Sequence, residues 1–587
     1  MRSRGMGEVH SDTFTPIHCG RNLTGQCVVG DKRVLRVSKV SIIFAPSYAI
    51  LGKRLMSRTR REFIKQSTLS AVALGAAGGG WLPTFGFTPQ GTVQGAAFKD
   101  LCLVALNAAR SKRATYADVR IVNKRNQFVA TQEERVSELQ DRETFGVGVR
   151  ALVNGAWGFA ASRTVTRDEC SRVALRAVEQ AEVNSRAIRR PVELATVSAY
   201  PDGRWMTPIR RDPFTVRMSD KTELLLEANR AAAAVSAARF VASSMYFVKV
   251  ETTFASTDGS IIEQTLYRSY PAMTVTAVGT DSDDVASHES TDIAPMGLGY
   301  EHVEAADLPG RATEWAELAV EMLSATSVEP GRYDLIIDPT NLFLTIHETI
   351  GRPTELDRAL GYEADYAGTS FLAPPETAIG EVRYGPEFMN VIGDRTQRGG
   401  LATVGWDDEG VTADSWPIIQ DGTFVDYQTT REQATLIAEL TGITRSHGCS
   451  FGESWDVAQL QRMPNVSLLP GENEVTLDDL VAATDRGILI KGCGPYSIDQ
   501  RQYNFQFGGH VCYEVRGGRI TRMLKDVAYQ GNTLEFWNSL DMLGGPRSYE
   551  LCGTIGDTKG QPTQLNAASH GCPAARFHDC RVINTAA

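Results

Sequence analysis

Residues 333–352 read YDLIIDPTNLFLTIHETIGR, and this stretch sets the interpretation of the second half of the chain. The apolar run over 333–337 predicts a short buried strand. Asp338 followed by Pro339 is typical of an N-cap and the first residue of a helix. We therefore expect a strand that leads directly into a helix, with the HETIGR sequence at the end of that helix.

His347 directly precedes Glu348 on this predicted helix. In metallopeptidases, such a histidine binds Zn²⁺ and the glutamate takes a proton from the water on the metal. The usual motif has its second histidine four residues after the first, on the same helical face, and here that position holds Gly351. An isolated His-Glu pair is more often a solvated surface pair, so the dipeptide alone does not define a metal site.

The patterns on either side indicate an α+β protein with two globular parts. Amphipathic helices are predicted at 98–110, 166–185, 219–237 and 309–325, with alternating strands between them and turns at Asn123 and Asn154. After Pro330-Gly331 most of the sequence reads as short strands separated by Gly, Pro, Asn and Asp. The predicted short strands include 423–427, 465–469, 487–490, 503–507, 511–515 and 519–524. We expect a mixed α/β domain over 98–327 and a mainly β domain over 328–587, without an internal repeat.

The first 97 residues are predicted to be a targeting segment. Residues 57–83 read SRTRREFIKQSTLSAVALGAAGGGWLP, which resembles a twin-arginine export signal, with Arg60 and Arg61 as the arginine pair. The apolar run after them is shorter than the roughly 20 residues of a stable membrane span. We expect a start at Met56 and cleavage near Ala96 or Ala97, which gives a periplasmic bacterial protein. A short helical membrane anchor is the alternative.

Charge and cysteine content exclude several function classes. The whole chain carries a formal net charge of -10, while residues 98–587 hold 47 basic and 66 acidic residues. Such an acidic body repels phosphate backbones, so nucleic-acid binding is not expected. The 10 cysteines contain no CxxC pair, and their spacing does not assign disulfides.

Several strings of the second half together resemble the TldD/PmbA family, the modulator of DNA gyrase-type metallopeptidases. The matching strings are HETIGRPTELDR (347–358), GWDDEG (405–410), RSHG (445–448), MPNV (463–466), YSIDQRQYNF (496–505) and CGTIG (552–556). The resemblance implies an HExxxH motif, with a second histidine five residues after the first, and a thiolate ligand from a C-terminal Cys-Gly segment. On this chain it assigns Zn²⁺ to His347 and Cys552, and the role of general base to Glu348. The helix would have to end or unwind at Gly351 to bring both motif ligands to one metal.

Arg352 stands where the family has its second histidine. A guanidinium is always protonated and has no lone pair for a metal, so two protein ligands remain where zinc sites normally have at least three. A substitute ligand could come from four side chains, each of which is more typical of an ordinary loop or strand residue: Glu355, His447, His510 and His570. Without a metal, Arg352 could instead hold a peptide carboxylate.

Two functional hypotheses follow. The first is an exported zinc metallopeptidase that hydrolyses unfolded peptides lying extended beside a strand edge, with Glu348 activating the water. The second is a non-catalytic partner subunit whose site has decayed at Arg352. The family resemblance implies a homodimer, or a heterodimer with another TldD/PmbA-type subunit. The persistence of His347, Glu348 and Cys552 favours retained chemistry.

Overall fold

The structure is a computed structural model that describes residues 95–280 and 284–586. The predicted twin-arginine segment lies outside these residues. Within them, none of the helices has the length and apolar character needed to cross a membrane. The α+β prediction is confirmed, with helices and long strands in the first half and mainly strands in the second.

One seven-stranded sheet, in the order β3-β2-β1-β5-β6-β4 with β7 beside β6, forms the first half. Its strands are β1 (Tyr116–Gln132), β2 (Arg135–Val153), β3 (Ala156–Ser162), β4 (Gly203–Met206), β5 (Ala238–Ser256), β6 (Ile261–Val278) and β7 (Val285–Glu289). The turn expected at Asn123 is wrong, because this residue lies inside β1, opposite Phe145 of β2 and Glu251 of β5. Its side-chain amide donates to Glu143 at 2.7 Å, so an asparagine sits in mid-strand with a polar partner.

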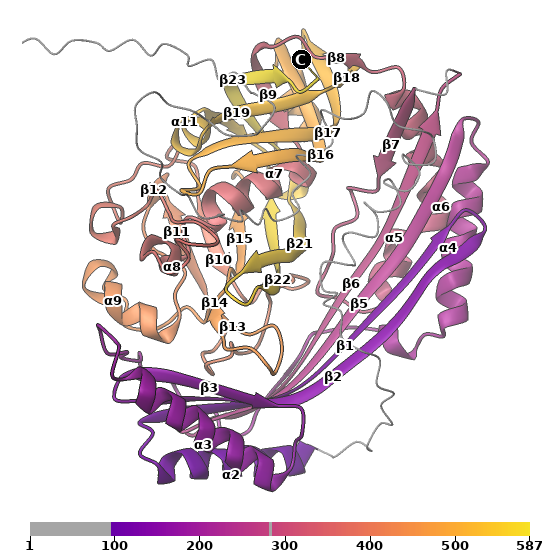
Figure 1. Cartoon of the computed structure of the whole chain (residues 1–587). Helices are drawn as coiled ribbons and strands as arrows, with labels where there is room; N and C mark the ends of the chain where they lie inside the picture. Colours follow the sequence, from indigo (N-terminus) through magenta and orange to yellow (C-terminus); the bar gives the residue numbers. More distant parts are fainter. Residues whose placement is uncertain (1–94, 281–283, 587) are drawn as a thin grey trace, which may run out of the picture. The chain divides into compact units, whose positions relative to one another are not determined.

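Two helix pairs cover the two ends of this sheet (Figure 1). α2 (Gly95–Ser111) and α3 (Arg167–Asn184) bury small apolar residues against one end of β1 and β2. α4 (Met218–Ala233) and α6 (Leu308–Met322) pack on the far end of β5 and β6, and α5 (Glu301–Ala306) precedes α6. All four predicted helices are therefore confirmed, because each has an apolar stripe that a sheet face buries.

The second half is built around a ring of five strands. β16, β9, β23, β19 and β17 pair in that order, and β17 pairs again with β16, so the ladder closes on itself. The strands of this larger sheet are β8 (Thr326–Ser327), β9 (Gly331–Ile337), β16 (Arg486–Ile498), β17 (Asn504–Arg516), β18 (Arg519–Lys525), β19 (Val527–Asn532), β20 (Leu540–Leu543) and β23 (Ala575–Asn584). The two strands expected at 503–507 and 511–515 are one strand, β17, because Gly508 and Gly509 continue the ladder instead of ending it.

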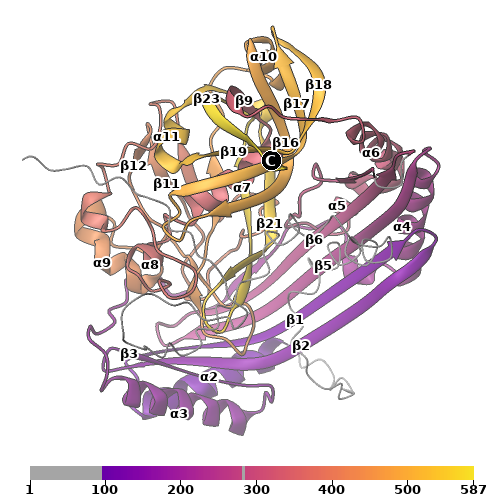
Figure 2. The ribbon, with the colours of Figure 1, turned by 45° about the horizontal axis from the view of Figure 1, so that its top comes forward.

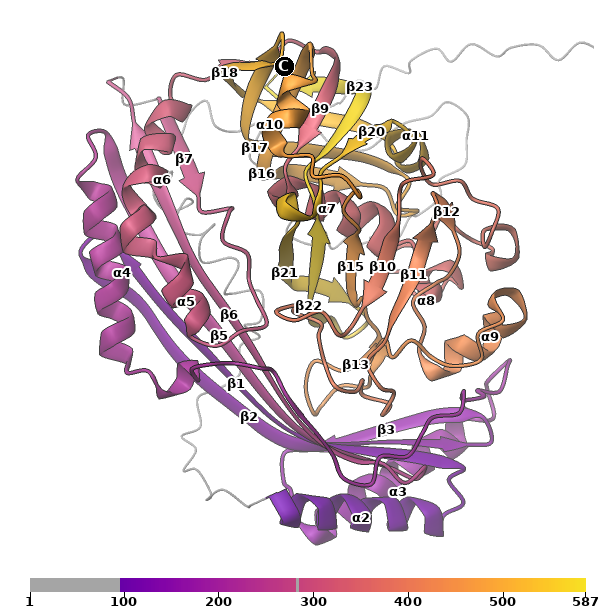
Figure 3. The ribbon, with the colours of Figure 1, turned by 180° about the vertical axis from the view of Figure 1, so that it is seen from behind.

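Smaller elements surround this ring. They are the strands β10 (Val391–Asp394), β11 (Ser415–Gln420), β12 (Thr423–Phe424), β13 (Ser450–Phe451), β14 (Leu460–Gln461), β15 (Asn465–Leu468), β21 (Glu550–Lys559) and β22 (Gln564–Cys572), and the helices α7 (Pro339–Ile346), α8 (Leu356–Ala359), α9 (Arg431–Thr441), α10 (Leu477–Ala482) and α11 (Thr533–Asn538). The strand expected over 423–427 is shorter than predicted, since β12 ends at Phe424. α7 packs against the β21–β22 hairpin (Figures 2 and 3).

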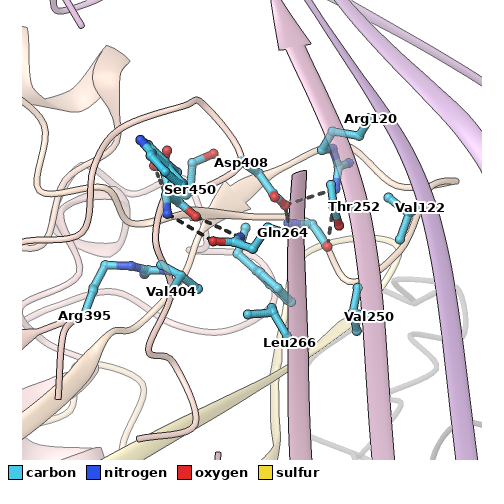
Figure 4. A pocket seen from close by; sticks show the side chains of 14 residues that line it. Arg120, Val122, Val250, Thr252, Gln264, Leu266, Arg395, Val404, Asp408 and Ser450 are labelled. Atoms are coloured by element: carbon cyan, nitrogen blue, oxygen red, sulfur yellow. Dashed lines mark hydrogen bonds and ion pairs between the residues drawn. The ribbon is translucent and has the colours of Figure 1, made fainter. Parts of the chain in front are cut away.

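The acidic loop 405–410 joins the two halves of the fold. The carboxylate of Asp408 pairs with Arg120 of β1 at 3.0 Å, and Glu409 pairs with Arg150 of β2 at 3.0 Å. The side-chain oxygen of Gln264 in β6 accepts the backbone N–H groups of the loop (Figure 4). A cavity of about 20 Å³ remains there, which has room for about one water molecule. The loop that resembles a family motif is thus a structural joint in this chain.

Candidate active site

α7 ends in a single π-helical turn, η3 (His347–Gly351). Asp338 caps α7 by accepting the N–H of Thr340, as predicted. The break expected at Gly351 takes a different form: the N–H of Arg352 donates to the carbonyl of His347 at 2.9 Å, so five residues are wound into one turn. Such turns are rare and are frequent at functional sites. This turn brings the side chain of Arg352 back toward Glu348, with 3.2 Å between Nη1 and Oε2.

His347 is buried against the β21–β22 hairpin. Its Nδ1 lies 2.8 Å from Nε2 of His570, and its Nε2 lies 3.4 Å from Oδ1 of Asp557. Nδ1 of His570 faces the carbonyl of Val466 at 2.9 Å, and a carbonyl can only accept. Burial lowers the pKa of His570 to about 3, so this ring is neutral. Its Nε2 therefore accepts a hydrogen bond from Nδ1–H of His347, and Nε2 of His347 faces the carboxylate of Asp557.

Asp557 is the anionic centre of the site. It is buried, pairs with Arg352 at 3.0 Å and with Arg462 at 3.0 Å, and its backbone carbonyl accepts a further bond from Arg462 at 2.7 Å. Burial alone would raise the pKa of Asp557, but the two guanidinium groups hold it well below its ordinary value. The same pairing works on Arg352: burial would lower its pKa, but Glu348 and Asp557 raise it above its ordinary value.

Glu348 is fully buried at the centre of the π-turn. Its two carboxylate oxygens receive no hydrogen bond of good geometry from any residue in the described part of the chain, and Arg352 is its ion-pair partner. The phenol of Tyr496 lies close by, and the charge of Glu348, with burial, raises the pKa of Tyr496. A buried carboxylate with open lone pairs can accept a proton from a bound water or from a substrate.

Cys552 lies across the hairpin ladder from His570. The two residues are directly paired in the antiparallel register, so both side chains lie on the same sheet face. Burial raises the pKa of Cys552 well above its ordinary value, so this thiol is protonated in the absence of a metal. Over residues 95–280 and 284–586, no three His, Cys, Asp or Glu side chains gather closely enough to hold a metal ion.

The four side chains proposed as substitute ligands lie in different places in the structure. His570 contacts His347 directly. His447 stacks on Trp416 and bonds to two aspartates, and His510 pairs with His288. Glu355 is bound by Arg358 and by Lys559, so it is fully used in a buried ion network. Only His570 is therefore placed to assist His347.

Sequence reasoning missed Asp557 and Arg462. Asp557 follows the Cys-Gly string directly, but a bulge in β21 between Thr554 and Asp557 turns it toward His347. Arg462 lies next to the MPNV string and donates to Asp557 from 95 residues away in the sequence. Both residues lie next to sequence strings that resemble the family. That position was the available signal, but it did not indicate that their side chains point into the site.

Three family profiles match consecutive parts of the chain. By their descriptions they are domain 1 (residues 117–184), the central domain (211–324) and the C-terminal domain (330–584) of the PmbA/TldA metallopeptidases. The chain belongs to the PmbA/TldD metallopeptidase family. The first profile covers β1, β2 and β3 and the second covers β5, β6 and β7 of the single seven-stranded sheet. The domain boundaries expected at 98, 327 and 328 stay a prediction.

Curated relatives and solved structures agree with this assignment. A metalloprotease of Methanothermobacter thermautotrophicus is 28% identical over 436 residues, which is 74% of this chain and 88% of the relative. A zinc metalloprotease TldD homologue of Saccharolobus solfataricus is 22% identical and covers 81% of this chain and 98% of its own length. The crystal structure of TldE from Thermococcus kodakarensis aligns with a TM-score of 0.62 at 15% identity, over 83% of this chain and 99% of that one, and shows the shared fold.

The side chains at the π-turn fit a metal in their chemistry. Nδ1 of His347 is held by His570, as is usual for a metal-ligating histidine, while its Nε2 faces the carboxylate of Asp557 at 3.4 Å. The buried carboxylate of Glu348 receives no hydrogen bond of good geometry from the described residues, and the thiol of Cys552 lies on the same sheet face as His570. Arg352 is the feature that departs from this fit, since its positive charge already neutralises Glu348 and Asp557.

Proposed function

We propose that this chain is a TldD-type metallopeptidase that hydrolyses unfolded peptides, with Glu348 as the general base. The observation that carries the proposal is Glu348 itself, which is fully buried in the π-turn beside His347. Its carboxylate has Arg352 as its ion-pair partner but receives no hydrogen bond of good geometry from the described residues. His347 and Cys552 would hold a Zn²⁺ ion, which would supply a Lewis acid for the scissile carbonyl. One curated relative that is named a zinc metalloprotease supports the choice of metal.

The chain's own residues have separable roles in this proposal. Glu348 accepts the proton of the attacking water and passes it to the leaving amine. His570 fixes the tautomer and orientation of His347 and is a positioning residue. Asp557 holds Arg352 in place from the opposite side, so that the guanidinium cannot move away from Glu348 without breaking two ion pairs.

A non-catalytic partner subunit is the second candidate function, and a specific observation favours it. Arg352 lies 3.2 Å from Glu348 and 3.0 Å from Asp557, so a guanidinium already supplies the positive charge that a metal would bring to these carboxylates. In this alternative, the buried cation keeps the site folded without a metal, and a second subunit performs the chemistry.

Metal analysis of three proteins tests the two candidates. We expect the wild type, purified without chelator, to hold close to one Zn²⁺ per chain and to cleave unfolded peptides. Glu348→Gln should keep the metal and lose cleavage, because a general base acts on water and need not be a ligand. Arg352→His should bind Zn²⁺ more tightly. A metal-free wild type that gains Zn²⁺ only as Arg352→His would overturn the enzyme proposal in favour of the partner subunit.

Export and assembly belong to the same proposal. Because the twin-arginine pathway reads its arginine pair, Arg60→Lys with Arg61→Lys should strand the precursor in the cytoplasm, and periplasmic recovery of that double variant would contradict export. We also propose association with a second chain of the same family, as a homodimer or heterodimer. Light scattering that finds a monomer both alone and with a coexpressed homologue would contradict this association.

A further inference from the structure

A cavity of about 410 Å³ lies apart from the π-turn and carries an unbalanced negative charge. Its walls come from both halves of the fold: β3 and α3 on one side, and α9 and the segments around 357–363 and 458–461 on the other. This volume lies within the range of small-molecule sites, roughly 300–1,000 Å³. Lys559 donates hydrogen bonds to Asp357 and Gln461 of the cavity wall. It also pairs with Glu355, whose charge acts on Arg352, so a chain of charged groups connects the cavity to the π-turn.

Four carboxylates line the cavity, and two of them are already neutralised. Asp357 pairs with Lys559 at 2.8 Å, and Glu409 pairs with Arg150 at 3.0 Å. The other two, Glu363 and Glu432, have no ion-pair partner among the residues that the structure describes. Glu363 is 8% exposed and accepts one backbone N–H at 3.3 Å, while Glu432 accepts the indole N–H of Trp157 at 3.1 Å.

Gln459 also contributes to the cavity wall. This residue is 7% exposed, and its amide nitrogen donates to Asp118 and to the carbonyl of Asp408, both at 3.1 Å. Since both partners can only accept, the orientation of the amide is fixed. Its carbonyl oxygen accepts no hydrogen bond within the described segments and has almost no exposed surface, so it is not open to the cavity.

The neighbouring cations are committed elsewhere. Arg150 is held by Asp118 and Glu409 and lies over the ring of Trp157, and Arg190 donates to the hydroxyl of Tyr362, at the wall of the cavity. Burying a carboxylate without a counter-charge is costly, and that cost disappears when a cation enters. Burial raises the pKa values of Glu363 and Glu432, although Lys559 acts to lower the first and Arg150 the second.

We propose that this cavity binds the guanidinium side chain of an arginine residue in a peptide, with Glu363 and Glu432 as its acceptors. A guanidinium offers five N–H donors in a planar fork, which suits several separate acceptors better than a single point charge does. Trp157 and Tyr362 supply aromatic surface for the side-chain stem. That the arginine belongs to a substrate peptide rests on the proposed function, whereas the binding of the cation does not.

Binding to the full mature chain tests the proposal without any activity assay. The probes are N-acetyl-arginine amide and N-acetyl-citrulline amide, which share shape but differ in charge, and the readouts are calorimetry and the fluorescence of the cavity-wall tryptophan. We expect the arginine derivative to bind at least tenfold more tightly than the citrulline derivative. Equal affinity of the two derivatives, or no binding of either, would overturn the proposal.

Matched variants locate the site. The double variant Glu363→Gln with Glu432→Gln removes both negative charges. Each glutamine keeps a carbonyl oxygen that can still accept the N–H donated to the native glutamate. We expect this double variant to bind arginine about tenfold more weakly. Glu439→Gln is the control, because this residue is exposed on the same helix α9 and should bind the probe like the wild type. Unchanged binding by the folded double variant would place the probe elsewhere and overturn the proposal. Failure of peptide cleavage with intact arginine binding would count against the proposed function alone.

Discussion

At the scale of single residues, Asp557 holds the site together. It is the shared anion of Arg352 and Arg462, and all three lie within one buried cluster. Asp557→Asn removes the charge, which leaves Arg462 without its counter-ion and Arg352 with Glu348 alone, so we expect the free energy of unfolding to fall by about 3–5 kcal/mol. Urea unfolding at neutral pH measures this loss.

The control for Asp557→Asn is an exposed ion pair. Glu474 pairs with Arg547 at 3.2 Å, with side chains 46% and 76% exposed, so Glu474→Gln should change stability by no more than about 1 kcal/mol.

The stabilisation by Asp557 should also depend on pH. Because the folded pKa of Asp557 is depressed, its contribution is complete above the unfolded value of about 3.9 and is lost as pH falls below it. Equal losses at pH 7 and in strong acid would contradict this role.

The sequence predicted His347, Glu348 and Cys552 because these residues lie in strings with a recognisable order. It could not predict that Asp557 faces Arg352, since the two are 205 residues apart and the contact depends on a strand bulge. It also could not rank His570 above His447. Both are histidines in the β half, and what separates them is which side chain each one meets.

At the scale of elements, Gly158 lets α3 approach β3 closely. A Cβ on Gly158 would lie 2.1 Å from the carbonyl oxygen of Ala177 and 2.5 Å from the backbone nitrogen of Ala181. The obstacle is helix backbone, which cannot rotate away, so Gly158→Ala should destabilise the protein by about 1–3 kcal/mol. Thermal unfolding and near-UV circular dichroism would show the loss and the disturbed packing around Trp157.

Gly531→Ala serves as the matched glycine control. Its added Cβ would meet only one ring carbon, of Phe505, at 3.8 Å, which is an ordinary contact. Comparable destabilisation by both substitutions would mean that general strand propensity, and not the approach of α3, explains the effect. If Gly158→Ala proves neutral, the close packing of α3 on β3 is not a source of stability.

Elements with a strong periodic pattern were predictable and elements set by tertiary pairing were not. α3 was found within one residue at either end, because Val173, Val178 and their neighbours repeat on one helical face. The π-turn was missed, since its single extra residue leaves no trace in the apolar pattern. β17 was split in two because Gly508 and Gly509 usually end a strand, whereas here partners on both edges keep it extended.

At the scale of the whole molecule, buried ion pairs connect the two halves of the fold. Arg120 of β1 is 2% exposed, pairs with Asp408 at 3.0 Å and donates to the carbonyl of Val457 at 2.7 Å. Arg150 and Glu409 form a second pair along the same loop. The two walls of the arginine-binding cavity proposed above come from different halves of the fold. The ion pairs between loop 405–410 and the N-terminal sheet therefore set the width of that cavity.

Arg120→Met tests how far this joint couples the two halves. The substitution keeps an apolar stem but leaves Asp408 without its counter-ion and the carbonyls of Gly452 and Val457 without the guanidinium donor, so we expect a loss of about 3–5 kcal/mol. Hydrogen exchange should show faster exchange in the N-terminal sheet near β1 and in residues 450–457, with the five-strand ring of the second half unchanged. The matched control is Arg125→Met on the same strand, where the pair with Asp141 is 38% and 34% exposed and a change within about 1 kcal/mol is expected. Exchange that accelerates evenly over the whole chain would show that the two halves unfold as one unit and that the joint is not a separate point of weakness.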